Sequence, residues 1–241
     1  MMKERSARWI LFTWLAASIV TTIVPATSEG HSLPGRGGFE PGGRAADCSV
    51  LPRPRLRVRL TIDQAYGLEA GPVVRQIVNE TWRPEGLSFD WISGEADADP
   101  WTGVNVWIAV VSGGPSADDG GIMGEVLFNR GAPRRLIRIY LDAAVAWVRR
   151  DQAARFGTET RILNQSLGAT AALVPRALGY VAAHEIGHFV LGSPKHSRNG
   201  LMQATYKRPA RLLRESNPLE LDPGNRGRLR ARLAESAGCP Y

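Results

Sequence analysis

The sequence lacks any apolar run long enough to span a membrane as a helix. The longest run, Trp9–Val24, has 16 residues, whereas a spanning helix needs about 20. No later segment is apolar enough to replace it. The sequence therefore predicts no stable membrane association once the leader has been removed.

The first residues have the order of a secretory leader. Basic residues come first, the apolar run follows, and small residues close the segment around Ala26–Ser28. We expect residues 1–28 to be a signal peptide and the protein to be secreted or periplasmic. An uncleaved membrane anchor remains the alternative, because no sequence rule separates the two cleanly.

Nucleic-acid motifs are also missing, although the chain is strongly basic. The formal net charge is +7 and the pI is near 10.0, mostly through arginine, which favours anionic partners. The arginine-rich segment Lys207–Arg232 has no interleaved aromatic residues and no nucleic-acid motif. It is typical of a solvated helical face, and we expect no nucleic-acid partner.

Cysteine is scarce. The chain has two, Cys48 and Cys239, near the two ends of the mature protein. In an oxidising compartment the pair is expected to form a disulfide bond. The alternative is that Cys48 caps a metal site as an inhibitory thiolate.

Length and composition predict one globular domain with a sizeable core, because 44% of the 241 residues are hydrophobic and 22% are charged. Residues 29–54 are rich in Gly, Pro and Arg without hydrophobic periodicity, and they indicate a flexible lead-in or a short pro-segment. We expect the folded domain to cover residues 55–241 and to be monomeric.

Strands and helices are mixed along this domain. Alternation of apolar and polar residues, or β-rich composition between turn residues, predicts strands at Arg55–Ile62, Leu87–Ile92, Val104–Val111, Ile122–Phe128 and Leu136–Leu141. Apolar residues three and four apart, with start and stop signals, predict helices at Pro72–Trp82, Asp142–Phe156 (Asp142 as N-cap), Pro175–Gly192 and Pro223–Ser236 (Asp222 as N-cap).

Three of the four histidines fall within thirteen residues of the third predicted helix and the segment after it. His184 and His188 lie four apart, so their imidazoles project from one face and are able to bind one metal ion. Glu185 is one residue round the helix from His184, where its carboxylate reaches a metal-bound water as general base. His196 is the third candidate ligand for Zn²⁺, which leaves the fourth position open for water.

The stretch His184-Glu-Ile-Gly-His-Phe-Val-Leu-Gly-Ser-Pro-Lys-His196, followed by Met202, resembles the metzincin zinc metallopeptidases of the matrixin-like branch. Their pattern is HExxHxxGxxH followed by a methionine turn. The resemblance covers about twenty residues strongly. Together with the order of elements it implies an α+β domain. Its twisted, mostly parallel sheet has one antiparallel edge strand and is backed by two long helices, the second of which carries the zinc ligands.

The third histidine departs from the family pattern. Seven residues separate His188 from His196, instead of five. The turn residues Gly192 and Pro194 still predict a chain reversal between them. If His196 is not the ligand, the next candidates are Glu215 and Glu220.

The resemblance also assigns expectations to neighbouring residues. Met202 would form the floor beneath the histidines, or it is an ordinary core methionine. Gly187 is expected to allow close packing of another backbone. Tyr206 would stabilise an oxyanion or only pack, and the strand Ile122–Phe128 would pair with an extended substrate. The loop Asp118–Gly121 is either a calcium site or a plain turn.

These features predict a secreted endopeptidase that acts on peptide or protein substrates through a zinc-bound water activated by Glu185. Two alternatives stay open. One is a secreted zinc-binding module without catalysis, and the other is a hydrolase of cell-wall amides, for which the positive charge is weak support.

Overall fold

The computed structural model describes most of the predicted domain, and all described residues belong to one unit, Ala45–Tyr241. Within the described part no helix is both long and apolar enough to cross a membrane. The structure does not describe the signal peptide, residues 29–53 of the lead-in, either cysteine, Asp118–Gly121, Tyr206 or Glu215. The described residues are 54–63, 69–92, 104–114, 122–156, 163–205 and 219–236.

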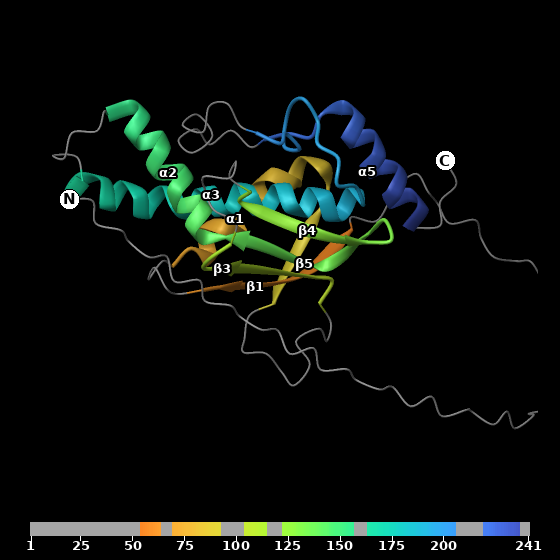
Figure 1. Cartoon of the computed structure of the whole chain (residues 1–241). Coiled ribbons are helices and arrows are strands. Elements are labelled where there is room, and N and C mark those ends of the chain that lie inside the picture. Colours follow the sequence, from red (N-terminus) through yellow and green to blue (C-terminus); the bar gives the residue numbers. More distant parts are fainter. Residues whose placement is uncertain are drawn as a thin grey trace, which may run out of the picture. The chain divides into compact units, whose positions relative to one another are not determined.

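A five-stranded sheet with the order β2-β1-β3-β5-β4 forms the centre of the domain (Figure 1). β1, β2, β3 and β5 are parallel to one another, and β4 pairs antiparallel with β5 at one edge. This is the α+β fold predicted from the sequence. The strands are β1 (Arg55–Ile62), β2 (Ser88–Ile92), β3 (Val106–Val111), β4 (Gly124–Asn129) and β5 (Ala132–Tyr140).

The period-two pattern of β1 is followed except at Arg59, which is also buried. Val58 is fully buried in the core, while Arg57 is exposed. The neighbouring strand β3 buries alternate residues in the same way, including Ile108, which pairs with Leu60. One face of the sheet is therefore apolar and is covered by helices.

Two long helices, α1 (Gly71–Trp82) and α3 (Leu163–Leu191), pack against each other and lie over the same face of the sheet (Figure 1). They approach closely at Gly179, where an added Cβ would lie 2.9 Å from Cβ of Ile77. The buried Trp82 ring donates from Nε1 to the Ala183 carbonyl at 3.1 Å. This contact fixes α3 at the residue before its first histidine.

Two helix starts differ from the prediction. α3 begins at Leu163, and Pro175 lies inside it instead of opening it. Proline suits a first turn because it lacks an N–H, but a helix held by tertiary packing tolerates one missing bond. α2 (Leu141–Phe156) begins one residue before Asp142. Asp142 is therefore not the N-cap, and its Oδ2 accepts a hydrogen bond from the Gly113 N–H at 2.6 Å.

The last helix, α5 (Pro223–Ser236), has the predicted bounds and the predicted N-cap. Asp222 Oδ1 accepts hydrogen bonds from the N–H groups of Gly224 at 3.0 Å and Asn225 at 3.1 Å. Arg226 ties the helix to the rest of the domain through Glu85, at the end of the short helix η2 (Arg83–Glu85), with its Nη2 2.9 Å from Oε1.

Candidate metal centre

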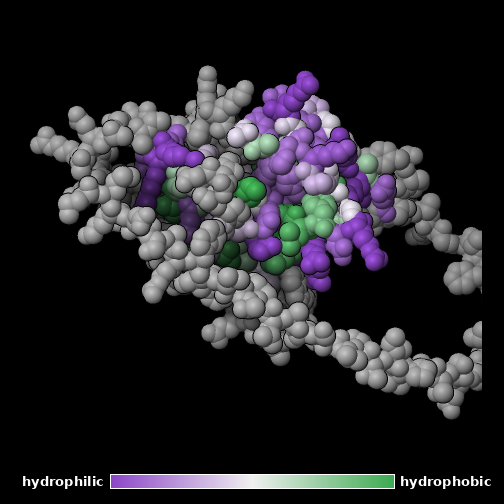
Figure 2. Space-filling model, viewed as in Figure 1, coloured by the Kyte–Doolittle hydropathy of each residue, from purple (hydrophilic) through white to green (hydrophobic). Residues whose placement is uncertain are grey.

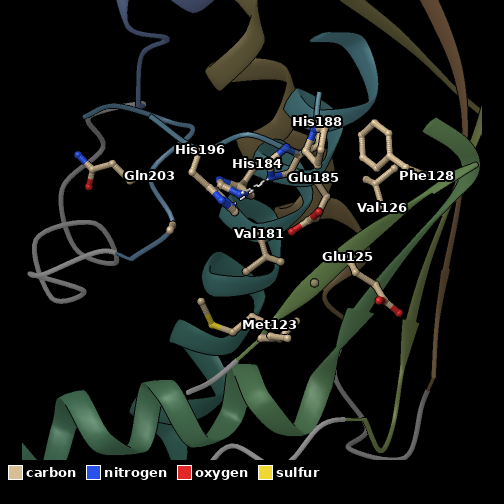
Figure 3. Close-up of a pocket in the computed structure, with 14 residues that line it drawn as sticks. Met123, Glu125, Val126, Phe128, Val181, His184, Glu185, His188, His196 and Gln203 are labelled. Carbon is tan, nitrogen blue, oxygen red and sulfur yellow. Dashed lines mark hydrogen bonds between the residues drawn. The ribbon is translucent and has the colours of Figure 1, made fainter. Parts of the chain in front are cut away.

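Three histidine side chains converge on one point beside α3 (Figure 3). His184 and His188 project from the same face of the helix, with their Nε2 atoms 3.1 Å apart. His196 comes from the loop after the helix, and its Nε2 lies 3.3 Å from that of His188. The structure thus brings together the three ligands proposed from the sequence.

The end of α3 explains how His196 reaches the other two despite its longer spacing. Gly192 adopts the left-handed conformation, with φ of +58°. Its N–H donates to the Phe189 carbonyl, and the Ser193 N–H donates to the His188 carbonyl. Pro194 follows and prevents further helix. The two residues by which this spacing exceeds the family pattern lie in this reversal, and the loop folds back over the helix.

Backbone carbonyls orient two of the imidazoles. Nδ1 of His184 lies 2.7 Å from the Leu201 carbonyl oxygen, and Nδ1 of His188 lies 2.7 Å from the Ser193 carbonyl oxygen. A carbonyl only accepts, so each Nδ1 carries the proton and each Nε2 keeps its lone pair. Carbonyl partners of this kind fix the tautomer of metal-binding histidines.

The donor set fits a tetrahedral ion such as Zn²⁺. Zinc–nitrogen distances near 2.0–2.1 Å place ligand nitrogens about 3.3 Å apart in a tetrahedron, close to the observed 3.1 and 3.3 Å. Facing lone pairs at this distance repel one another unless a cation lies between them. The exposed side of His196 leaves room for a fourth ligand.

Burial keeps the inner histidines in the form that binds metal. The pKa of His184 is lowered to about 4, mainly by burial; the hydrogen bond to Leu201 opposes this shift, and the nearby His188 and His196 add to it. Burial likewise lowers the pKa of His188. Both imidazoles are therefore neutral at pH 7, so a metal ion does not have to displace protons from them.

Glu185 lies beside the histidines and is almost fully buried, with 5% of its surface exposed. It fits beneath β4 because residue 124 is glycine. A Cβ on Gly124 would lie 2.9 Å from Cγ and 3.1 Å from Oε1 of Glu185. Burial, together with the negative charge of Glu125, raises the pKa of Glu185 to about 8. A divalent cation at the histidines would oppose this shift by attraction.

A polar cluster on β4 and β5 was not predicted. Tyr140 donates its hydroxyl proton to Oε1 of Glu125 at 2.5 Å, and Arg138 Nη2 lies 3.0 Å from the same oxygen. Burial raises the pKa of Tyr140, and the hydrogen bond to Glu125 raises it further. The antiparallel register pairs Glu125 with Arg138, and nothing in the local sequence specifies that register.

Met202 lies under the helix at Gly187, between the two histidines. Met202 is fully buried, and a Cβ on Gly187 would lie only 2.3 Å from its sulfur. The expectation that Gly187 admits another backbone is wrong, because it admits this thioether. The position of Met202 agrees with a floor beneath the histidines and also makes it part of the core.

Glu220, one of the alternative ligands, does not join the histidines. Its side chain is 69% exposed and lies 3.4 Å from Arg226. Its backbone carbonyl instead accepts a hydrogen bond from the Leu201 N–H at 2.8 Å. The segment that precedes α5 thus supports the loop whose carbonyl orients His184.

A cavity of about 350 Å³ opens over the three histidines and Glu185. On one side it is lined by β4 and the residues before it, from Ile122 to Phe128. The other side is formed by Pro194, His196 and the loop residues Gln203 and Ala204. Figure 3 shows Val126 and Phe128 on the β4 side, across from His196 and Gln203. The candidate site is therefore open to a ligand along an edge strand.

The chain matches no protein-family model and no curated protein sequence. The histidine cluster and its surroundings therefore carry the functional inference.

Proposed function

We propose that the protein is a zinc-dependent hydrolase of peptide bonds, similar in its site to the metzincins. One observation carries the proposal. Three imidazole Nε2 atoms converge in an open cavity, and the buried carboxylate of Glu185 lies beside them. A closed site with four protein ligands would be structural, whereas three ligands and an open side suit catalysis.

Glu185 would move the proton. When bound, zinc lowers the pKa of a coordinated water and polarises the substrate carbonyl. Glu185 accepts a proton from the attacking water while the water oxygen bonds to the carbonyl carbon. It then returns the proton to the amide nitrogen as the C–N bond breaks. Its apolar surroundings make the carboxylate a stronger base than an exposed one, which suits this role.

An extended peptide fits the cavity beside β4. This strand is the edge of the described sheet and pairs on one side only, with β5. Its open edge therefore offers backbone donors and acceptors to an added strand. We expect the substrate to pair antiparallel with β4, because antiparallel pairing is slightly more stable per residue than parallel pairing.

We expect this activity to lie outside the cytoplasm. The basic start, the apolar run and the small residues at Ala26–Ser28 support export. An exported peptidase would act on peptides or proteins of the periplasm or the medium.

Metal dependence tests the proposal. Protein prepared with one zinc per chain is expected to cut an unfolded protein substrate, to lose the activity on removal of the metal, and to regain it with one equivalent of zinc. The substrate fragments are identified by mass spectrometry. Cleavage that persists after complete metal removal would contradict the proposal.

A further inference from the structure

Three exposed cations lie within two residues, along the chain, of residues that line the cavity. Arg130 lies in the β4–β5 turn, two residues after the cavity residue Phe128. Lys195 and Arg198 lie in the loop that carries His196, on the opposite side. None of the three forms an ion pair with a residue that the structure describes.

The described acids near the cavity do not neutralise these cations. Glu125 already forms an ion pair with Arg138 and accepts a hydrogen bond from Tyr140, and Glu185 is buried. Glu220 is paired with Arg226. Apolar side chains form much of the cavity wall. In the view of Figure 2, hydrophobic residues (green) are bordered by hydrophilic ones (purple). The site thus combines an apolar centre with a positive rim.

The direction of β4 decides which part of a substrate meets this rim. β4 and the histidine helix run the same way across the cavity: Gly124 packs on Val181 and Glu185, and Phe128 lies towards His188 (Figure 3). A peptide antiparallel to β4 runs the other way. Its residues before the scissile bond therefore lie towards Phe128 and Arg130.

We propose that the cleft selects peptides with acidic side chains before the scissile bond, bound by Arg130, Lys195 and Arg198. This inference rests on the proposed function, because it uses the direction of a paired substrate. Gly124 lies beside Glu185, and Arg130 is six residues farther along the chain. Two paired strands advance residue by residue together. The acidic side chains of the substrate are therefore expected roughly three to six positions before the scissile bond.

Peptide binding to the zinc-loaded Glu185→Ala variant tests the selection without cleavage. Three fluorescent peptides share one apolar centre and carry Glu before it, Glu after it, or Gln at both places. The first is expected to bind about three- to tenfold more tightly than the others in dilute salt, since exposed ion pairs are weak and additive at best. Concentrated salt is expected to remove the difference. Equal affinities in dilute salt, or preference for Glu after the centre, would overturn the proposal.

Side-chain variants locate the selection. Arg130→Asn keeps the positive-φ turn, since φ of residue 130 is +50° and asparagine tolerates that region. Combined with Lys195→Gln, it is expected to lower affinity for the acidic peptide about two- to tenfold and to leave the Gln peptide unchanged. Arg149→Gln, at an exposed arginine of α2 that does not line the cavity, is the matched control. A preference that survives in the double variant would contradict the assignment.

Cleavage of the Gln peptide by the wild-type protein separates the two proposals. If the Gln peptide is cut but the acidic one binds no better, the charge selection fails and the hydrolase stands. If the acidic peptide binds selectively and no peptide is cut, the hydrolase fails and the acidic-peptide surface stands.

Discussion

At the scale of single residues, the site depends on which nitrogen of each histidine holds the proton. The Leu201 and Ser193 carbonyls accept hydrogen bonds from the Nδ1–H groups of His184 and His188, so both Nε2 lone pairs point at the same place. His196 brings a third Nε2 from a different segment. This arrangement is unfavourable without a cation, and binding energy from the cation stabilises the fold.

Substitution His196→Ala is expected to weaken zinc binding by more than roughly 10- to 100-fold. That range is typical when a residue that hydrogen-bonds a metal ligand is removed. The effect is larger here because the ion loses one of three ligands. Competition with a chromophoric zinc indicator measures the affinity. His31→Ala is the matched control, because His31 is the one histidine outside the cluster. Unchanged affinity in His196→Ala would mean that another residue is the third ligand.

Substitution Gly187→Ala is expected to destabilise the protein by about 1–3 kcal/mol, since the new methyl group overlaps the sulfur of Met202. Urea unfolding of the metal-free protein measures this effect. Gly227→Ala in α5 is the control, because an added Cβ there meets nothing within 4 Å. It is expected to stabilise by up to about 1 kcal/mol. Equal effects of the two changes would show that Met202 does not pack as described.

Residue-scale prediction from the sequence was good where the spacing is local. His184, Glu185 and His188 share one helical turn, so their relative placement follows from α-helix geometry. The cluster of Glu125, Tyr140 and Arg138 depends instead on the register between two strands. That register arises from packing across the sheet and has no signature in a short stretch of sequence.

At the scale of elements, α5 supports the metal-site loop through the segment before it. Glu220 holds Leu201 by a backbone hydrogen bond, and Asp222 caps the helix and receives a hydrogen bond from Ser197. Leu201 in turn orients His184. The helix cap and the histidine are thus connected through one loop.

Substitution Asp222→Ala is expected to cost about 1 kcal/mol at pH 7 through loss of the N-cap. Burial alone would raise the pKa of Asp222, but hydrogen bonds from Asn225, Ser197 and Gly224 outweigh it, and the pKa is lowered. A carboxylate whose pKa is lowered by folding stabilises the protein at pH values above its unfolded pKa of about 3.9. This stabilisation is lost as the pH falls through the pKa of the folded state.

The stability gap between wild type and Asp222→Ala, measured by urea unfolding, should therefore shrink below about pH 4. Asp222→Asn is the control, because asparagine is also a good N-cap and does not titrate. A gap that is the same at pH 7 and at pH 3 would show that the charge of Asp222 does not contribute.

Element boundaries were less predictable than element types. The hairpin strand β5 begins at Ala132, four residues before the apolar stretch that predicted it. Backbone pairing with β4 extends it through Pro133 and the exposed Arg134. α3 likewise begins at Leu163, before Pro175, because packing on α1 and α2 holds a helix that the local signals would start only at Pro175.

At the scale of the whole molecule, metal binding at the histidine cluster would be coupled to folding. Two ligands come from α3, and the third comes from a loop that Gly192, Leu201 and the segment before α5 hold in place. These groups come together only in the folded chain. A metal ion therefore binds the native state much more tightly than the unfolded one.

Removal of the metal is therefore expected to lower the free energy of unfolding. With free zinc at about 1,000 times its dissociation constant, the loss is about 4 kcal/mol. Thermal unfolding in buffered zinc and in chelator measures it. His184→Ala is the control, because its stability should respond little to zinc. Identical melting of the wild-type protein under the two conditions would contradict a site built from these histidines.

The sheet order and the placement of the histidines agree with the α+β arrangement expected from the sequence. Alternation in β1 and the run of β-rich segments made the strands recognisable, and the motif identified the helix that carries the site. The positive rim at Arg130 and Lys195 was not predicted. The two residues are 65 positions apart in the chain, and only the fold places both beside one cavity.

Cleavage of an unbiased peptide library tests the central claim most directly. Zinc-loaded protein covering residues 29–241 and its Glu185→Ala variant are compared at equal zinc content, and the products are identified by mass spectrometry. We predict internal cuts by the first protein that fall by at least about 100-fold in the variant and disappear on chelation. Cuts of equal yield in both proteins, or none in either despite bound zinc, would contradict a hydrolase that uses Glu185 as its base.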